Sequence, residues 1–336
     1  MKVLQVYFFM ILLQVILLSN TSICIAQSGN EITEKAICKS PNIEWLQEIS
    51  SESIKTSSSG FFESLSDLIF GSDDLTILKP FSLVTDSEGS IFFIDQDNKK
   101  LLKYSFDENE LESLLNDDVE LKSPIGLCIN QTALIFTDSE LNTVFKYDFY
   151  SEETSVLNSS LEQPTVIIYL ESIQEFWICE TKQHRIARLN KDGKLLGTIG
   201  QRGNGQGQFN FPTFIWSDGN GNIYVNDSMN FRIQIFSSDG KFKNQFGKSG
   251  DGSGDFSRPK GIATDSYDNI YVVDALFNNV QVFDQSGRLL DVFGERGTDP
   301  EMFWLPTGIF IDKQNKIFVA DSFNSRIQIY QLRCEN

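Results

Sequence analysis

From Pro80 onward, short apolar runs alternate along the chain with clusters of Gly, Asn, Asp and Ser. In the run Arg326-Ile-Gln-Ile-Tyr330, polar and apolar residues follow the period of two that is typical of a strand. The segment Asp218-Gly-Asn-Gly-Asn222 supplies turn residues that accept a positive φ. This pattern predicts many short β-strands joined by tight turns.

The predicted strands recur as one unit that is repeated six times. Each unit opens on a proline, at intervals of 44, 40, 48, 47 and 47 residues, and carries an acid 14 to 16 residues further on. The prolines are Pro80, Pro124, Pro164, Pro212, Pro259 and Pro306, and the acids are Asp95, Asp138, Glu180, Asp227, Asp274 and Asp321. Four strands per unit is the content of one propeller blade, and a ring of such sheets buries the faces that one sheet alone would expose. We therefore predict an all-β fold, a six-bladed β-propeller with four-stranded antiparallel blades, over residues 67–336.

The sixth unit ends after its third strand, at about Leu332. A strand from the N-terminal side is expected to complete this blade, because a closed ring leaves no exposed strand edge. Two segments before Pro80 are the candidates, Asp67–Phe70 and Leu75–Leu78. Residues 27–66 are rich in Ser, Glu and Lys, and we predict a poorly ordered or partly helical lead-in there.

The last three units share the pattern Pro-x-Gly-Ile-x-x-Asp, then Ile-Tyr-Val-x-Asp, then Asn-x-Arg-Ile-Gln-Ile-Phe, each with small departures. This pattern resembles NHL repeats. The resemblance covers about residues 67–332; it is moderate in the third unit and degenerate in the first two. It implies a six-bladed propeller that serves mainly as a binding platform, although some relatives of the fold are enzymes.

The N-terminus is predicted to be a signal peptide, residues 1–26. The apolar run Val6–Leu18 is too short for an untilted membrane span, and Cys24-Ile-Ala26 offers small side chains before a cleavage site. We therefore expect a secreted, periplasmic or other extracellular protein without a membrane span after cleavage. The alternative is a membrane anchor formed by an uncleaved signal.

The chain is acidic, with 46 Asp and Glu against 28 Lys and Arg and a formal net charge of −18. Because each nucleic-acid phosphate contact needs a cation, this charge argues against a nucleic-acid partner. It suits solubility, a basic partner or a divalent cation, and we expect a monomer. Cys38 and Cys334 flank the repeats and could form a disulfide, since export permits one. Cys128 and Cys179 lie in apolar runs and are expected to be small buried side chains.

The repeated acids have two readings. Six carboxylates at one place in six blades could surround a metal ion, but repetition in every copy is typical of scaffold residues that bind backbone amides, and we favour the scaffold. We interpret the basic residues five positions later, Arg185, Arg232 and Arg326, in the same way, as partners in an ion pair or hydrogen bond. No metal site and no cofactor are predicted, with Ca²⁺ kept as the alternative.

The sequence gives little support to the hypothesis that this protein is an enzyme. The single histidine is His184, and a lone base without a nucleophile or an orienting group does not make a catalytic site. Peptidylglycine-amidating lyases and streptogramin lyases use propellers of a similar kind, and the resemblance implies a site with several histidines. One histidine cannot supply such a site. Lactonases of the gluconolactonase type hold a calcium-like ion with Glu, Asn and Asp, and no subset of such residues stands out here by position. We predict a protein that is not an enzyme, with a metal-dependent lactonase-like hydrolase, its site in the central channel, as the alternative.

Function is best sought where the blades depart from one another. The loops after the acids carry apolar residues where NHL units favour small or polar ones, and these side chains would form either a partner site or a plug of the central channel. The partner-binding candidates are Met229, Phe231, Leu276, Phe277 and Phe323, together with His184 in the equivalent loop. Aromatic residues before the prolines, namely Phe209, Phe256, Phe303 and Trp304, are expected to cap the blade cores. The sequence thus predicts a non-catalytic propeller that binds a protein, peptide or glycan.

Overall fold

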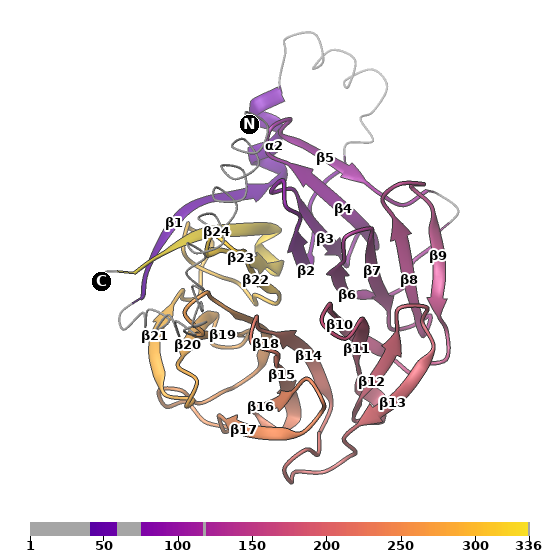
Figure 1. Ribbon diagram of the computed structural model, residues 1–336. Coiled ribbons are helices and arrows are strands. Elements are labelled where there is room, and N and C mark those ends of the chain that lie inside the picture. Colours follow the sequence, from indigo (N-terminus) through magenta and orange to yellow (C-terminus); the bar gives the residue numbers. More distant parts are fainter. Residues whose placement is uncertain (1–40, 59–74, 117–118, 335–336) are drawn as a thin grey trace, which may run out of the picture. The chain divides into compact units, whose positions relative to one another are not determined.

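The structure is a computed structural model that describes residues 41–58, 75–116 and 119–334 (Figure 1). In that part of the chain, 24 strands form six antiparallel sheets of four strands each. The first strands of the six sheets contact one another in a closed cycle, β2 with β6, β10, β14, β18, β22 and back to β2. The sheets therefore surround a central channel, and the predicted six-bladed β-propeller is confirmed.

In blades 1 to 5 the strands run outward from the channel in chain order, and blade 6 takes its outermost strand from the N-terminal side. Blade 1 holds β2 (Pro80–Thr85), β3 (Ile91–Asp95), β4 (Lys100–Ser105) and β5 (Glu110–Ser113). Blade 2 holds β6 (Pro124–Ile129), β7 (Ala133–Asp138), β8 (Thr143–Asp148) and β9 (Thr154–Asn158). Blade 3 holds β10 (Pro164–Leu170), β11 (Glu175–Glu180), β12 (Arg185–Asn190) and β13 (Leu195–Ile199). Blade 4 holds β14 (Pro212–Ser217), β15 (Asn222–Asp227), β16 (Arg232–Ser237) and β17 (Phe242–Phe246). Blade 5 holds β18 (Pro259–Thr264), β19 (Ile270–Asp274), β20 (Asn279–Phe283) and β21 (Leu289–Phe293). Blade 6 holds β22 (Ile309–Ile311), β23 (Lys316–Asp321), β24 (Arg326–Cys334) and, outermost, β1 (Pro41–Ser50).

The ring is closed by β1, which pairs antiparallel with β24 (Figure 1). A closing N-terminal strand was expected, but its predicted position is wrong: residues 75–78 form no strand, and 67–70 lie outside the described residues. The propeller thus begins at residue 41, within the segment 27–66 that was predicted as a lead-in, and α2 (Ser51–Ser58) follows β1 directly. The register shifts between Trp45 and Gln47, so the apolar period of two is broken and the strand is hard to recognise from sequence.

β1 is equivalent to the fourth strand of the other blades. Its Glu48 lies opposite Gln328 of β24, as Gln245 of β17 lies opposite Gln234 of β16. Ile43 and Trp45 pack into the core shared with blade 5, and Ile49 packs into the core shared with blade 1. The N-terminal strand therefore completes the sixth sheet and both of its packed interfaces.

The hydrophobic core consists of layers between neighbouring blades. One such layer joins Ile94 and Leu101 of blade 1 to Leu134 and Phe136 of blade 2, all of them fully buried. Each sheet is thereby covered on both faces, which a single blade could not achieve.

Glycine at the third position of three units allows the innermost strands to approach closely. A Cβ at Gly126 would lie 2.3 Å from the Thr165 carbonyl oxygen of blade 3, and one at Gly261 would lie 2.6 Å from the Thr307 carbonyl oxygen of blade 6. At Gly308 the corresponding distance to the Phe81 carbonyl oxygen of blade 1 is 2.1 Å. The Pro-x-Gly pattern thus reflects contact between the blades at the channel wall.

The propeller has two faces with different loops. We use "loop face" for the side that carries the connections between blades and the loops after the repeated acids. We use "turn face" for the opposite side, which carries the turns between first and second strands and between third and fourth strands. No helix among the described residues is long and apolar enough to cross a membrane. Residues 1–26, the predicted signal peptide, lie outside the described residues.

Candidate functional site

The repeated acids are buried at the ends of the second strands, with exposed fractions of 0 to 1%. Among the described residues, the carboxylates of blades 1 and 2 accept hydrogen bonds from backbone N–H groups alone. Asp95 accepts from Leu78, Lys79 and Asn98, and Asp138 accepts from Lys122, Ser123, Glu140 and Leu141. Each of these carboxylates ties the loop that follows it to the connection entering its own blade.

In blades 4 and 6 the acid also accepts from side chains. Asp227 Oδ2 accepts from Arg232 Nε at 2.8 Å, Asn230 Nδ2 at 2.8 Å and Gln234 Nε2 at 3.1 Å. The same three donor positions recur around Asp321, as Asn324, Arg326 and Gln328. Burial raises the pKa of Asp321 above its usual value, although the hydrogen bonds from the Trp304 N–H, Asn324 and Arg326 partly offset this rise. The arginines Arg232 and Arg326 also donate to carbonyls of the preceding connection, so each cluster joins the blade to its entry segment.

Blades 3 and 5 hold intermediate versions. Glu180 accepts from the Glu162 N–H and from Arg185 Nε at 2.6 Å. Asp274 accepts backbone N–H groups on both sides, from Ser257, Arg258, Leu276 and Phe277. In every blade the carboxylate oxygens are therefore engaged by N–H donors. Among the described residues, no group of three or more His, Cys, Asp or Glu lies together as metal ligands would.

His184 links two blades. It has a left-handed backbone (φ 54°), and its Nδ1 accepts the Phe211 N–H, one residue before Pro212, at 3.1 Å. The Asn142 side chain accepts the equivalent N–H of Gln163, and the Asn278 side chain accepts that of Leu305. The histidine thus occupies a repeat position four residues after the acid, where an imidazole nitrogen replaces an amide oxygen. Burial lowers its pKa.

The apolar candidates divide into exposed and packed side chains. Met229, Leu276 and Phe323 are exposed on the loop face at 55, 51 and 47%. Phe231 and Phe277 are half-buried, and Phe231 packs into the core between blades 4 and 5. The sequence therefore identified loops that carry exposed apolar residues, but it did not separate the exposed residue of each loop from its packed neighbour.

Three further exposed apolar residues lie on the loop face, in the connections that enter the blades: Leu78, Phe211 and Trp304. Trp304 was expected to cap a blade core, and this is wrong. Phe209, Phe256 and Phe303 are the core caps, three residues before each proline. Trp304 comes one residue later, is 41% exposed and contacts Phe323 in a tilted arrangement with ring centroids 5.9 Å apart. Its position relative to Pro306 was the sequence signal that separates it from the caps.

We call the six exposed loop-face residues the apolar rim: Leu78, Phe211, Met229, Leu276, Trp304 and Phe323. They come from blades 4, 5, 6 and 1, whose innermost strands are consecutive in the ring. Trp304 contacts Phe323, and Lys79, next to Leu78, places its Nζ 5.2 Å from the Phe323 ring centroid. The loop-face ends of blades 2 and 3 instead carry the charged residues Glu140 and Lys182.

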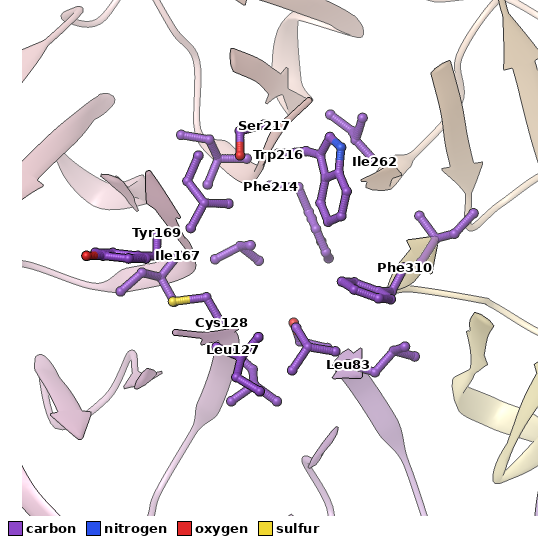
Figure 2. Close-up of a pocket in the computed structure, with 18 residues that line it drawn as sticks. Leu83, Leu127, Cys128, Ile167, Tyr169, Phe214, Trp216, Ser217, Ile262 and Phe310 are labelled. Atoms are coloured by element: carbon purple, nitrogen blue, oxygen red, sulfur yellow. The ribbon is translucent and has the colours of Figure 1, made fainter. Parts of the chain in front are cut away.

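The central channel is apolar. A cavity of about 180 Å³ lies among the innermost strands of all six blades (Figure 2). Its walls include Leu83, Leu127, Ile167, Ile215, Ile262 and Phe310. Ca²⁺ is bound by oxygen ligands, mostly carboxylates and carbonyls. The described lining holds no Asp or Glu, so it does not fit the calcium-like ion of the lactonase alternative.

The cysteines fall into two groups. Cys128 and Cys179 are free and buried, as expected, and burial raises the pKa of both thiols. Cys334 takes part in a disulfide. Cys38 lies outside the described residues, so the Cys38–Cys334 bridge stays a prediction.

Comparison with known proteins supports the class of fold. A family model described as "6-bladed beta-propeller" matches residues 216–275 and 264–335, which lie in blades 4 to 6. No curated protein matches the chain.

Solved structures with the same fold include binding proteins and enzymes. An auxiliary nutrient binding protein from Bacteroides thetaiotaomicron VPI-5482 is 13% identical with a TM-score of 0.63, over 77% of this chain and 71% of that one. A virginiamycin B lyase from Staphylococcus aureus is 16% identical with a TM-score of 0.56, over 87% and 100%. A gluconolactonase from Xanthomonas campestris is 16% identical with a TM-score of 0.57, over 76% and 86%. At these identities the likeness shows the fold alone.

Proposed function

We propose that this protein is an exported, non-catalytic propeller of the NHL type that binds a protein or peptide through the apolar rim. The observation that carries the proposal is the gathering of six exposed apolar side chains on one face of four consecutive blades. Exposed apolar residues scattered singly need no explanation, but residues that gather on one face mark an interaction site. Aromatic residues and Met, which make up four of the six, are enriched at protein interfaces.

The chemistry of the site supports binding rather than catalysis. The Nδ1 atom of the single histidine accepts a hydrogen bond from a backbone N–H, and the repeated carboxylates accept hydrogen bonds from N–H donors. A hydrolytic site needs a base, a nucleophile or a metal within reach of one reacting atom. The loop face offers no such set among the described residues, and the channel lining does not fit a hard cation.

Export is part of the proposal. The predicted signal peptide supports it, and so does the disulfide of Cys334, because disulfides persist in oxidising compartments.

The test compares two double variants of the secreted protein. Phe323→Asp with Met229→Asp places two charges on the rim, and Leu196→Asp with Val292→Asp places two charges on equally exposed apolar positions of the outer strands β13 and β21. Partners are captured from the extracellular fluid of the source on the immobilised wild type and identified by mass spectrometry. We expect the rim variant to lose at least tenfold in affinity for the captured partner, and the outer-strand variant to keep it.

Equal binding by both variants would contradict the proposal. Loss of binding by the outer-strand variant alone would place the interface on the blade edges. A captured glycan in place of a protein would correct the partner class. Hydrolysis of a lactone panel by the wild type that is lost on chelation would favour the hydrolase.

A further inference from the structure

Two stacked aromatic rings lie across the central channel, and a pocket lies on the turn-face side of them. Phe81 of blade 1 and Phe214 of blade 4 stack with ring centroids 5.8 Å apart. Blades that are three places apart in a ring of six can touch only across the axis, so these two rings close the channel. Lys260 of blade 5 adds its Nζ 5.9 Å from the Phe81 centroid. The cavity is lined by Phe214 but not by Phe81, which places it on the turn-face side of the stack.

The size and lining of this pocket fit a six-membered ring. Its volume is about 180 Å³, and 13 of its 18 lining residues are Leu, Ile, Val, Phe or Trp. Trp216 and Phe310 meet edge to face across it at 5.7 Å, and Figure 2 shows the labelled side chains around an open centre. An apolar cavity of about 150 Å³ with a similar lining stays free of water and accepts benzene. A phenyl ring would therefore fit the pocket and contact mainly apolar side chains.

The pocket opens into a groove on the turn face, between blades 1 and 2. The groove has a volume of about 1170 Å³ and shares Ile129, Tyr169 and Phe310 with the pocket. Its other walls come from the first turns of blades 1, 2, 3 and 6, from the outer strands of blade 1, and from the end of the third strand of blade 2 with the turn after it. The charged residues that line it are Asp86, Glu88, Lys103, Glu112, Glu152, Glu171, Asp312 and Lys313.

Charge selects the ligand. Six of the eight charged residues are acids, and one of the two lysines, Lys103, is already paired with Glu112 at 2.7 Å. Low-dielectric walls that carry one sign of charge raise the local concentration of the opposite ion. The aromatic residues Tyr169 and Phe310 line both the pocket and the groove, and aromatic rings attract cations. The same carboxylates would repel an anion.

We propose that the turn face binds a small organic ammonium ion that carries a phenyl-sized apolar group. The apolar group enters the channel pocket, and the ammonium lies at the mouth, against the aromatic rings and the groove carboxylates. This site is independent of the apolar rim, because the Phe81–Phe214 stack separates it from the loop face.

Three probes with the same ring test the charge of the ligand: 2-phenylethylammonium, 2-phenylethanol and 3-phenylpropionate. Binding is followed at pH 7 by the methyl NMR signals of Ile167, Ile215 and Ile262, which line the pocket. We expect concentration-dependent shifts of these signals with the ammonium. We expect at least tenfold weaker binding of the alcohol, and weaker binding still of the carboxylate.

Two variants test the two halves of the site. Ser82→Leu fills the pocket, which Ser82 lines, and should abolish the binding of all three probes. Glu88→Gln with Glu171→Gln removes two exposed groove charges and should weaken the binding of the ammonium toward that of the alcohol without changing the alcohol itself. The charge variant keeps the test decisive even where Ser82→Leu does not fold.

Several results would overturn the proposal. Unshifted pocket methyls with all three probes at 10 mM, on the order of the weakest affinities worth calling binding, would exclude the pocket. Equal affinity for ammonium and carboxylate would exclude the charge selection. Loss of ammonium binding in the rim variant Phe323→Asp with Met229→Asp would place the ligand on the loop face instead. The rim proposal itself is tested by a different measurement on this variant, the capture of a protein partner, so the two proposals can fail separately.

Discussion

Blades 4 and 6 and blades 1 and 2 bury the same acid in different ways. In the first pair a carboxylate, an arginine, a glutamine and an asparagine form one buried cluster. In the second pair the carboxylate accepts backbone N–H groups only, and the basic position holds Lys100 or Thr143. The fold therefore requires that the buried carboxylate be satisfied, not that one set of side chains do so. The difference also explains why the repeat is easy to recognise in the late blades.

The largest contrast is expected at the basic position. Arg326→Met removes the ion pair with Asp321 and the contact with Glu48 of β1 at 2.7 Å, and leaves a fully buried carboxylate without its cation. Breaking a buried pair in this way costs about 3–5 kcal/mol of unfolding free energy. The same change in blade 1, Lys100→Met, affects an exposed side chain and should cost less than about 0.5 kcal/mol. Guanidinium chloride unfolding of both variants measures the difference.

Similar losses of unfolding free energy in the two variants would contradict this prediction. They would show that the side-chain cluster around the acid of a late blade stabilises the fold no more than the backbone N–H groups around the acid of an early blade. A second variant, Arg232→Met in blade 4, separates the cluster from ring closure. Arg232 contacts Gln245, a residue of its own blade, where Arg326 contacts the N-terminal strand.

The channel wall should respond alike in early and late blades. Gly126→Ala and Gly261→Ala each direct a Cβ against a carbonyl oxygen of the next blade, at 2.3 and 2.6 Å. Overpacking of this kind costs about 1–3 kcal/mol. Gly219→Ala, where a Cβ meets nothing within 4 Å, is the matched control and should leave stability within about 0.5 kcal/mol. A large loss at Gly261 with none at Gly126 would extend the early–late difference to the inner strands.

The sequence was sufficient for the ring but not for its closure or its surface. Prolines and acids at regular intervals predicted six blades, because every blade needs the same entry and the same buried carboxylate. β1 could not be recognised from the sequence, because the bulge at Leu46 breaks its alternation of apolar and polar residues and 29 residues separate Ser50 from Pro80. The apolar rim was predicted in part: Met229, Leu276 and Phe323 depart from a repeat, whereas Leu78 and Phe211 lie in connections of variable length. The channel pocket depends on contacts between opposite blades, which cannot be recognised from any local sequence pattern.

A smaller effect of opposite sign is expected at Lys260. The equivalent positions of the other blades are uncharged, and no described ion pair includes Lys260. Burial, together with Arg258, lowers its pKa from 10.5 to about 8. The folded state therefore loses the proton at a lower pH than the unfolded chain, and stability rises between pH 8 and 10.5. Lys260→Met should gain about 2 kcal/mol at pH 7 and lose this gain above pH 10.5.

Thermal unfolding of wild type and Lys260→Met at pH 7 and at pH 10 measures this gain. The exposed Lys313→Met is the control and should change neither value. A gain that does not depend on pH would assign the effect to packing rather than to the buried charge.

The smallest effect is expected at His184, where early and late blades share one device. Asn142 in blade 2 and Asn278 in blade 5 accept the same N–H that His184 accepts in blade 3. His184→Ala leaves the Phe211 N–H without this acceptor and should cost about 1 kcal/mol. His184→Asn should restore wild-type stability at pH 7, since Asn tolerates the left-handed backbone at φ 54° and supplies the acceptor. Failure of Asn to restore stability would show that the imidazole ring does more than accept this bond.

The pH dependence separates the histidine from its replacement. Because burial lowers the pKa of His184, its contribution is present in full above the unfolded value of about 6.5 and is lost as the pH falls through the folded pKa. The wild type should therefore lose more stability than His184→Asn as the pH is lowered from 7 through the folded pKa, which urea unfolding at several pH values would detect. Parallel pH profiles would mean that His184 has the same pKa in the folded and unfolded chain, and that the link between blades 3 and 4 does not depend on its neutral form.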